Sequence, residues 1–233
     1  MSGRTVLAGA VGAAAAIQCA PAISCHAPLV CELLALRRRL AGTGTVALTF
    51  DDGPHPEGTV AVLKVLARHA SKATFFLVGE QVRRYPALAR EIADAGHALG
   101  LHGETHRCEL RLTPWMLAED RARGLESIHW ATGVLPVIHR PPYGAASGPG
   151  IVHARLKGIE TVLWSRWGRD WRRSATADTV LHDVTRSGPL DQEIVLLHDA
   201  DHYAAPDSFH ATIAALPAIL ERCAAQGLVA VRL

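Results

Sequence analysis

Two adjacent carboxylates are the first residues of this sequence whose types and spacing could do chemistry. Asp51 and Asp52 follow the apolar run Thr45–Phe50 and precede Gly53 and Pro54, which stop a strand and turn the chain. Like charges this close resist joint ionisation at the end of a buried strand. One carboxylate therefore needs a cation and the other needs a hydrogen-bond donor. Taken alone, the stretch fits a solvated turn equally well.

Two histidines further along the chain have the spacing of metal ligands. His102 and His106 stand in the sequence His-Gly-Glu-Thr-His. A metalloprotease helix needs His-Glu-x-x-His, whereas Glu104 lies two residues from each histidine and Gly103 weakens a helix. We therefore exclude the protease interpretation. Two histidines and one carboxylate would leave an open coordination position, which is typical of catalytic rather than structural zinc.

Three further segments carry polar or aromatic side chains of interest. Arg140 begins the stiff sequence Arg-Pro-Pro-Tyr-Gly and can hold a carboxylate bidentately. His198 leaves an apolar run directly. The stretch Trp164–Trp171 combines three indoles with one acid, Asp170. Indoles at this position either stack on a sugar ring or roof the fold, and the residues alone leave both alternatives open.

The elements that must position these side chains alternate regularly after residue 44. We predict strands in seven apolar runs: Thr45–Phe50, Ala73–Val78, His97–Leu101, Pro136–His139, Glu160–Trp164, Glu193–Leu197 and Leu228–Leu233. We predict six helices between them: 60–67, 88–95, Pro114–Ala131, Gly150–Lys157, Thr176–Arg186 and Phe209–Ala225. This alternation predicts a parallel α/β fold, either a closed or distorted barrel or an open doubly wound sheet. The polar residues then meet at the carboxyl ends of the strands.

Composition narrows the remaining possibilities. A chain of 233 residues suits one large domain, and a net charge of +2 does not suggest a nucleic-acid surface. Five cysteines without metal-site spacing predict reduced thiols rather than a disulfide framework. The apolar run Val6–Ala22 is either a weak secretory segment or a surface-packing helix, and it is short for a membrane span. We favour a cytoplasmic location over export, with no membrane partner.

Five motifs of the sequence, taken together, resemble those of the NodB-type polysaccharide deacetylases. They are Thr-Phe-Asp-Asp-Gly-Pro (49–54), His102-x-x-x-His106, Arg140-Pro-Pro-Tyr-Gly144, Asp170-Trp171 and Leu-Leu-His198. The resemblance covers roughly residues 43–233 as one catalytic domain and leaves residues 1–42 as a helical or targeting segment. It implies a distorted (β/α)7 barrel, which agrees with the seven predicted strands.

The resemblance also implies a metal site. Asp52, His102 and His106 would bind a divalent ion, usually Zn²⁺. The family usually has Ser or Thr after the first metal histidine, and here that residue is Gly103. Since this residue is not a ligand, the departure concerns the geometry of the loop rather than the activity.

The same resemblance implies the acid–base groups. Asp51 would be the general base, oriented by Arg140. His198 would be the general acid, with Asp170 as its hydrogen-bond partner. The backbone amide of Tyr143 would help the metal to stabilise the oxyanion. The reaction implied is removal of acetyl from an N-acetylglucosamine unit of a glycoside or oligosaccharide.

The sequence Trp-Gly-Arg-Asp-Trp (167–171) and the polar loop Asp199-Ala-Asp-His-Tyr-Ala-Ala-Pro206 carry a closer resemblance, to actinobacterial deacetylases of glycopeptide antibiotics. This closer resemblance suggests the substrate. It predicts an N-acetylglucosamine carried on a bulky, partly aromatic pseudoaglycone of the teicoplanin type. The predicted substrate-binding residues, besides Tyr143, are Trp164, Trp167, Trp171, His202 and Tyr203. Two alternatives stay open. One is a deacetylase of cell-wall or chitin-type oligosaccharides, and the other is an inactive sugar-binding module.

Overall fold

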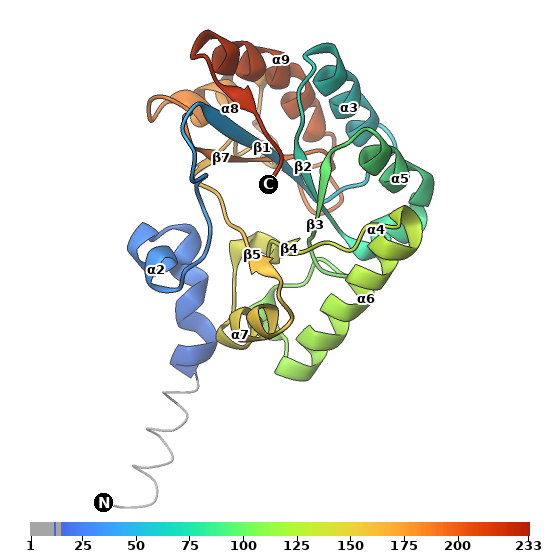
Figure 1. Cartoon of the computed structure of the whole chain (residues 1–233), viewed down its shortest axis with the longest axis vertical. Helices are drawn as coiled ribbons and strands as arrows, with labels where there is room; N and C mark the ends of the chain where they lie inside the picture. The colour runs from blue at the N-terminus through green and yellow to red at the C-terminus, as the bar shows by residue number, and fades with distance from the viewer. Residues whose placement is uncertain (1–11, 13–14) are drawn as a thin grey trace, which may run out of the picture.

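The structure of the chain, a computed structural model, describes residues 12 and 15–233 (Figure 1). Residues 15–19 are helical, and much of the apolar run Val6–Ala22 lies outside the described residues. Among the helices that are described, none is both long and apolar enough to cross a membrane. All five cysteines are unpaired, as their number and spacing predicted.

The strands of the described chain form one curled sheet in which all strand pairings are parallel. They are β1 (Thr45–Asp51), β2 (Thr74–Leu77), β3 (Ala98–Leu101), β4 (Ile138–His139), β5 (Glu160–Thr161), β6 (Arg166–Trp167), β7 (Ile194–His198) and β8 (Val229–Ala230). Their order is β5-β4-β3-β2-β1-β7-β6, and β8 pairs with β1. The predicted distorted barrel is therefore confirmed, with one more short strand, β6, than the sequence predicted.

The helices lie on the outer side of the curled sheet (Figure 1). They are α2 (Pro28–Leu33), α3 (Gly58–Arg68), α4 (Gly79–Arg84), α5 (Pro86–Asp94), α6 (Pro114–Thr132), α7 (Gly148–Leu156), α8 (Ala177–Thr185) and α9 (Phe209–Ala225). Short 3-10 turns are η1 (Ala20–Cys25), η2 (Glu109–Arg111) and η3 (Pro142–Gly144). The longest helix, α6, begins with Pro114 after the capping Thr113 and ends at Gly133, whose φ is 75°.

Strand β1 is buried along almost its whole length because it lies in the middle of the sheet. Its neighbours are β2 and β7, and the register places Asp51 opposite Phe76 on one side and His198 on the other. The end of β1 therefore brings a carboxylate next to an imidazole from a strand almost 150 residues away, which is how the fold assembles a site.

Two apolar clusters form the core. The larger lies between the sheet and the outer helices and includes Val46, Leu48 and Phe50 of β1. The smaller contains Ala47 and Trp164 together with residues from before the first strand: Cys25, Cys31 and Leu36. The chain ahead of β1 is thus part of a core that it shares with the barrel.

Residues 37–40 fill the seam between the two ends of the sheet. Arg37 forms a parallel bridge to Val162, just after β5, and Arg39 forms an antiparallel bridge to Glu193, just before β7. The backbone N–H of Leu163 donates to the carbonyl of Arg37 at 2.8 Å. In Figure 1 this segment runs between β7 and β5, so the barrel is sealed by chain that precedes its first strand.

Candidate active site

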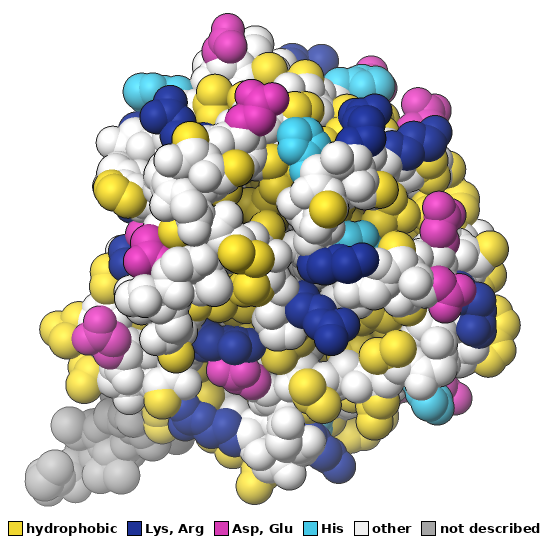
Figure 2. All heavy atoms as spheres, turned by 45° about the horizontal axis from the view of Figure 1, so that its top comes forward, with side chains coloured by type: hydrophobic (Ala, Val, Ile, Leu, Met, Phe, Trp, Pro, Cys, Tyr) yellow, Lys and Arg dark blue, Asp and Glu magenta, His cyan; other side chains and the backbone are white. Residues whose placement is uncertain are grey.

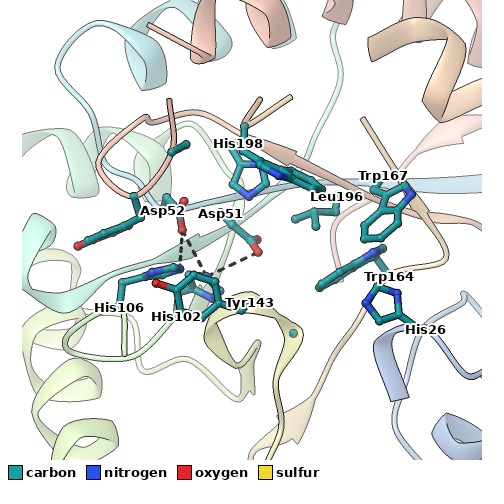
Figure 3. Close-up of a pocket in the computed structure, with 14 residues that line it drawn as sticks. His26, Asp51, Asp52, His102, His106, Tyr143, Trp164, Trp167, Leu196 and His198 are labelled. Carbon is teal, nitrogen blue, oxygen red and sulfur yellow. Dashed lines mark ion pairs between the residues drawn. The ribbon is translucent and has the colours of Figure 1, made fainter. Parts of the chain in front are cut away.

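Asp52, His102 and His106 form a cluster suited to a metal ion at the carboxyl ends of β1 and β3. Each offers a ligand atom, and these atoms all lie within 4.8 Å of one another. The Oδ1 of Asp52 lies 3.4 Å from Nε2 of His102 and 3.2 Å from Nε2 of His106 (Figure 3). Asp52 holds a φ of 78°, which is rare for a residue with a side chain and marks a position constrained by its surroundings.

Hydrogen bonding shows that this donor set fits a cation. The Nδ1 of His102 donates to the carbonyl of Arg140 at 2.8 Å, which orients the ring so that Nε2 faces Asp52. The Oδ1 of Asp52 is buried and receives no hydrogen bond within the described structure. The Nδ1 of His106 is also buried without a hydrogen-bond partner within the described structure. A buried carboxylate oxygen with no donor, beside an imidazole nitrogen that is free to accept, is an arrangement that suits a cation.

Protonation in this cluster follows from burial and from the neighbouring rings. Burial alone would raise the pKa of Asp52, but the close His102 and His106 rings and the charge of His198 hold that pKa well below its usual range. Burial lowers the pKa of His106, against the opposing effect of Asp52. An ionised carboxylate beside neutral imidazoles is the state that binds a metal.

The loop that carries both histidines is held by helix α6. Asp120 accepts hydrogen bonds from the backbone N–H of Glu104 at 2.9 Å, from that of Thr105 at 3.2 Å, and from the Thr105 hydroxyl at 2.6 Å. Gly103 has a φ of 85°, and a Cβ there would lie 2.8 Å from the carbonyl oxygen of Thr105. Position 103 is therefore glycine rather than Ser or Thr because the loop adopts a backbone conformation there that suits glycine.

The side chain of Glu104 points away from the metal cluster. It is buried, pairs with Arg83 and accepts a hydrogen bond from Ser127 at 3.1 Å. Glu104 therefore ties the loop between the two histidines to helices α4 and α6. This contact fits the exclusion of a metalloprotease, in which the intervening glutamate would do chemistry.

Asp51 forms a fully buried pair with Arg140. The Nη1 of Arg140 donates to Oδ1 of Asp51 at 2.6 Å and contacts Oγ1 of Thr49 at 2.8 Å. The guanidinium lies 4.1 Å from the centroid of the Phe76 ring and is completely buried. Arg140 therefore fixes one oxygen of Asp51 and leaves Oδ2 facing the cavity side, 3.8 Å from His102.

His198 is held by Asp170 from the strand-end loop after β6. The Nδ1 of His198 donates to Oδ1 of Asp170 at 2.8 Å, and the His198 backbone N–H donates to Oδ2 at 2.7 Å. Thr212 donates to the same carboxylate at 2.5 Å. Burial alone would lower the pKa of His198, but the charge and hydrogen bond of Asp170, with Asp52 and Asp51, raise it to about 10. His198 therefore carries a proton at neutral pH.

These groups open into one cavity of about 460 Å³. It is lined by ten of the residues that the sequence predicted for the site: Asp51, Asp52, His102, His106, Tyr143, Trp164, Trp167, Trp171, His198 and Tyr203. Arg140 and Asp170 lie behind the lining, each against the residue it was predicted to orient. Asp51, Asp52, His102, His106 and His198 gather on one side, and Trp164 and Trp167 lie on the other (Figure 3).

His202 alone among the predicted substrate-binding residues does not line this cavity. Its Nε2 lies 3.3 Å from the carbonyl of Pro54, and its ring packs on His55. His55, Asp201 and His202 also bring ligand-type atoms within 4.8 Å of one another. However, Nδ1 of His55 accepts the Gly58 backbone N–H at 3.0 Å, so Nε2 of the neutral ring keeps its proton and is a poor ligand.

Three residues in or behind the site were not among the predicted site residues. His26 lines the cavity although it lies in the segment before the barrel, and Leu196 lines it from β7. Asp199 is fully buried, and burial raises its pKa to about 7. A Cβ at Gly53 would lie 2.6 Å from Oδ2 of Asp199, which explains the glycine after the paired carboxylates. For Leu196 the motif Leu-Leu-His198 was an available signal.

A parallel α/β barrel with a metal-type cluster beside a buried carboxylate–arginine pair and a proton-bearing histidine defines the class of this protein. The chain belongs to the polysaccharide deacetylase family, whose family model, described as "Polysaccharide deacetylase", matches residues 39–162. The resemblance to NodB-type deacetylases is therefore confirmed.

Two curated relatives show the extent of the similarity. The chain is 34% identical over 209 residues to a peptidoglycan-N-acetylglucosamine deacetylase of Bacillus cereus, covering 83% of this chain and 93% of the relative. It is 36% identical over 171 residues to a chitooligosaccharide deacetylase of Bradyrhizobium sp., covering 72% and 77%. These names give no support to the closer resemblance to glycopeptide-antibiotic deacetylases.

Solved structures agree with the fold. A family 4 carbohydrate esterase from Streptomyces lividans, in complex with acetate, matches with a TM-score of 0.71 at 30% identity, covering 80% of this chain and 91% of that one. A CE4 family pseudoenzyme from Bacillus anthracis matches with a TM-score of 0.74 at 26% identity, covering 83% and 65%. The fold therefore occurs in a protein described as a pseudoenzyme as well as in esterases.

Proposed function

We propose that this protein is a metal-dependent deacetylase that removes acetyl from N-acetylglucosamine units of peptidoglycan-type or chitin-type saccharides. The observation that carries the proposal is the convergence of Asp51, His198 and the Asp52–His102–His106 cluster on one cavity. The two relatives named for peptidoglycan and chitooligosaccharide deacetylation support the substrate class.

The metal would be held by Asp52, His102 and His106. Zn²⁺ suits two imidazoles and a carboxylate with a position left open. When bound, a divalent ion supplies Lewis-acid activation of the amide carbonyl and of a water molecule. The remaining steps belong to side chains of this chain.

Asp51 would act as the general base. Because Arg140 occupies Oδ1, the Oδ2 of Asp51 is the oxygen that can take a proton from the attacking water. The water oxygen bonds to the acetyl carbon and gives a tetrahedral species. The backbone amide of Tyr143, at a residue with a φ of 62° beside the cavity, is the proposed donor to its oxyanion.

His198 would act as the general acid. An amine cannot leave as an anion, so the C–N bond breaks as the nitrogen receives the proton of His198. The raised pKa keeps this proton in place at neutral pH, and Asp170 stabilises the imidazolium until transfer. The products are acetate and the free amine of glucosamine.

A second candidate substrate is N-acetylglucosamine on a bulky aromatic aglycone. The aromatic lining of the cavity favours it, since Trp164, Trp167 and Trp171 line it beside the reaction centre, and Tyr143 and Tyr203 pack on His106. The names of the relatives favour the saccharide instead. Comparing kcat/KM for chitin oligomers and for an acetylglucosaminyl glycopeptide core decides between them.

An inactive sugar-binding module is the alternative from another class, and the pseudoenzyme of the same fold gives it a precedent. Here the base, the acid and the three metal residues are all present and converge on one cavity. That convergence favours the enzyme, because a binding module needs no proton donor and acceptor around an open cluster.

Acetate release tests the proposal. The purified protein, loaded with Zn²⁺, is incubated with N,N′,N″-triacetylchitotriose and with peptidoglycan fragments, with and without a chelator. We expect acetate only in the metal-loaded samples. His106→Ala should lose both bound metal and activity while its circular dichroism stays unchanged. No acetate from any acetylated aminosugar would favour the binding module.

A further inference from the structure

A row of aromatic rings leads from the reaction centre to the segment before the barrel. Trp171 lies 5.6 Å from His198, Trp167 lies 5.7 Å from Trp171, and His26 lies 5.6 Å from Trp167, measured between ring centroids. His198, Trp171, Trp167 and His26 all line the same cavity. In Figure 3 His26 stands at the end of the cavity away from the metal cluster.

His26 is held firmly even though its own side chain is exposed. The preceding residue, Cys25, is buried in the smaller core. It packs so closely on Gly144 that a Cβ added to this glycine would lie 3.1 Å from the Cβ of Cys25. Gly144 belongs to η3, beside the proposed oxyanion donor. On the other side, the Nε of Arg38 donates to the carbonyl of Trp164 at 3.3 Å. The segment is therefore held to the barrel on both sides of His26, and the imidazole itself contacts the Trp167 ring edge-on.

The size and chemistry of this end fit a second sugar ring. A cavity of about 460 Å³ lies within the range that holds drug-sized ligands, which is more space than one N-acetylated sugar needs. Indole rings present flat apolar surfaces, and an exposed imidazole both donates and accepts hydrogen bonds. A pyranose has an apolar C–H face for Trp167 and hydroxyl groups for His26.

We propose that His26 and Trp167 form a subsite for the sugar that neighbours the reacting N-acetylglucosamine, and that His26 determines specificity there. The inference rests on the proposed function for the identity of the reacting unit. It goes beyond that function because His26 lies outside the residues that match the family, 39–162. The segment ahead of the barrel thus contributes to substrate choice as well as to the core.

The kinetic test compares N-acetylglucosamine with N,N′-diacetylchitobiose, called chitobiose below, in the metal-loaded, full-length protein. We expect His26→Ala to raise KM for chitobiose roughly three- to tenfold, as for the loss of one or two hydrogen bonds, with kcat unchanged. The monomer should show no change in KM. His26→Asn, which keeps hydrogen-bonding capacity, should recover part of the loss. His129→Ala removes an exposed histidine of α6 and is the matched control.

Three results would overturn the subsite. The first is a ratio of kcat/KM for chitobiose to kcat/KM for the monomer that is the same in His26→Ala as in the parent. The second is a His26→Ala variant whose selectivity between N-acetyl and N-butyryl substrates changes while its preference for chitobiose does not. That result would mean that this end of the cavity holds the acyl chain. The third is a parent protein that prefers the monomer.

A binding measurement keeps the subsite separate from the proposed function. Chitobiose is titrated into the metal-free proteins and followed by tryptophan fluorescence, because Trp167 lies beside His26. If the parent releases no acetate, a weaker affinity of His26→Ala for chitobiose still supports the sugar subsite, although the deacetylase proposal fails. Equal affinities in the parent and in His26→Ala reject the subsite whatever the activity.

Discussion

Asp51 and Asp52 are neighbours in the chain, but their surroundings give them different tasks. The buried guanidinium of Arg140 contacts Asp51 at 2.6 Å, whereas Asp52 faces the two imidazoles of His102 and His106. One carboxylate is thus paired with a permanent cation and the other is left for a metal ion. This difference resolves the electrostatic conflict that two adjacent carboxylates create.

The first prediction separates the two carboxylates. Asp51→Asn should lower kcat by roughly 10²–10⁴, the usual contribution of one acid–base group, because an amide cannot accept the proton of water. Metal content, measured by mass spectrometry of the elements, should stay near that of the parent, since Asp52 and both histidines remain. If Asp51→Asn bound no metal, Asp51 would be a ligand and the roles of the pair would have to be exchanged.

The second prediction concerns pH. The pKa of His198 is raised in the folded protein to about 10, so the protonated ring stabilises the fold. This stabilisation is complete below the unfolded pKa of about 6.5 and disappears as the pH rises through the folded pKa. Asp170→Asn removes the carboxylate that contributes most to raising the pKa of His198. The variant should therefore be less stable than the parent at pH 6, by a margin that shrinks towards pH 10.

Activity gives a second measurement of the same pair. The alkaline limb of kcat/KM should move to lower pH in Asp170→Asn, because His198 would lose its proton sooner. Asp178→Asn, an exposed carboxylate in the first turn of α8, is the control. An unchanged alkaline limb together with an unchanged pH dependence of unfolding would show that Asp170 does not set the protonation of His198.

At the scale of elements, helix α6 positions the loop between His102 and His106. Asp120 takes three hydrogen bonds from residues 104 and 105, which lie between the two histidines. We expect Asp120→Ala to lower the affinity for Zn²⁺ by about 10- to 100-fold, the usual effect of removing an outer partner of metal ligands. Competition with a chromogenic chelator measures this affinity without reference to activity.

The neighbouring residue provides the control for this prediction. Glu119 is exposed on the same helix, and Glu119→Ala should leave the affinity unchanged. Equal affinities in the two variants would mean that the loop holds its shape without α6. Circular dichroism shows whether either variant has lost helix content.

The elements that the sequence predicted well are those with an unambiguous apolar pattern. β1 ends within one residue of its prediction because an inner parallel strand is apolar on both faces. Helix α9 has the predicted bounds, Phe209–Ala225. β6 was missed because Arg166 and Trp167 have no strand pattern, and α4 was missed because Gly79–Arg84 is short and mostly polar.

The site residues that belong to sequence motifs could be predicted. Asp51, His102 and His198 lie directly at strand ends, so their convergence follows from the parallel fold alone. His26 could not be predicted, since its place depends on how the segment before the barrel packs beside Trp167. His202 follows a strand end as well, but its loop bends it onto His55. Loop conformation is a tertiary property that local sequence does not determine.

At the scale of the whole molecule, Glu193 closes the seam of the barrel. It is buried and binds Arg39 of the segment before the barrel at 2.8 Å and Arg166 of β6 at 3.0 Å. Glu193→Gln should lower the free energy of unfolding by about 1–3 kcal/mol, because Arg166 loses its charged partner. The exposed Arg39 contributes little to this figure.

Urea denaturation measures this stability. Glu221→Gln removes an exposed carboxylate of α9 and should leave the transition midpoint unchanged. A Glu193→Gln variant that unfolds at the same urea concentration as the parent would show that the seam is held by backbone bridges and apolar packing alone.

The sealed seam has a consequence for the order in which the molecule forms. Arg38 and Trp164 are 126 residues apart along the chain, and Arg39 and Glu193 are 154 apart. Contacts between such distant residues carry the largest loop-closure cost and form late in folding. The local pairs β1–β2 and β2–β3 can assemble well before them. We therefore expect the aromatic end of the cavity to form last. A folding chain would then bring Asp52, His102 and His106 together before it completes the wall that we propose to select the substrate.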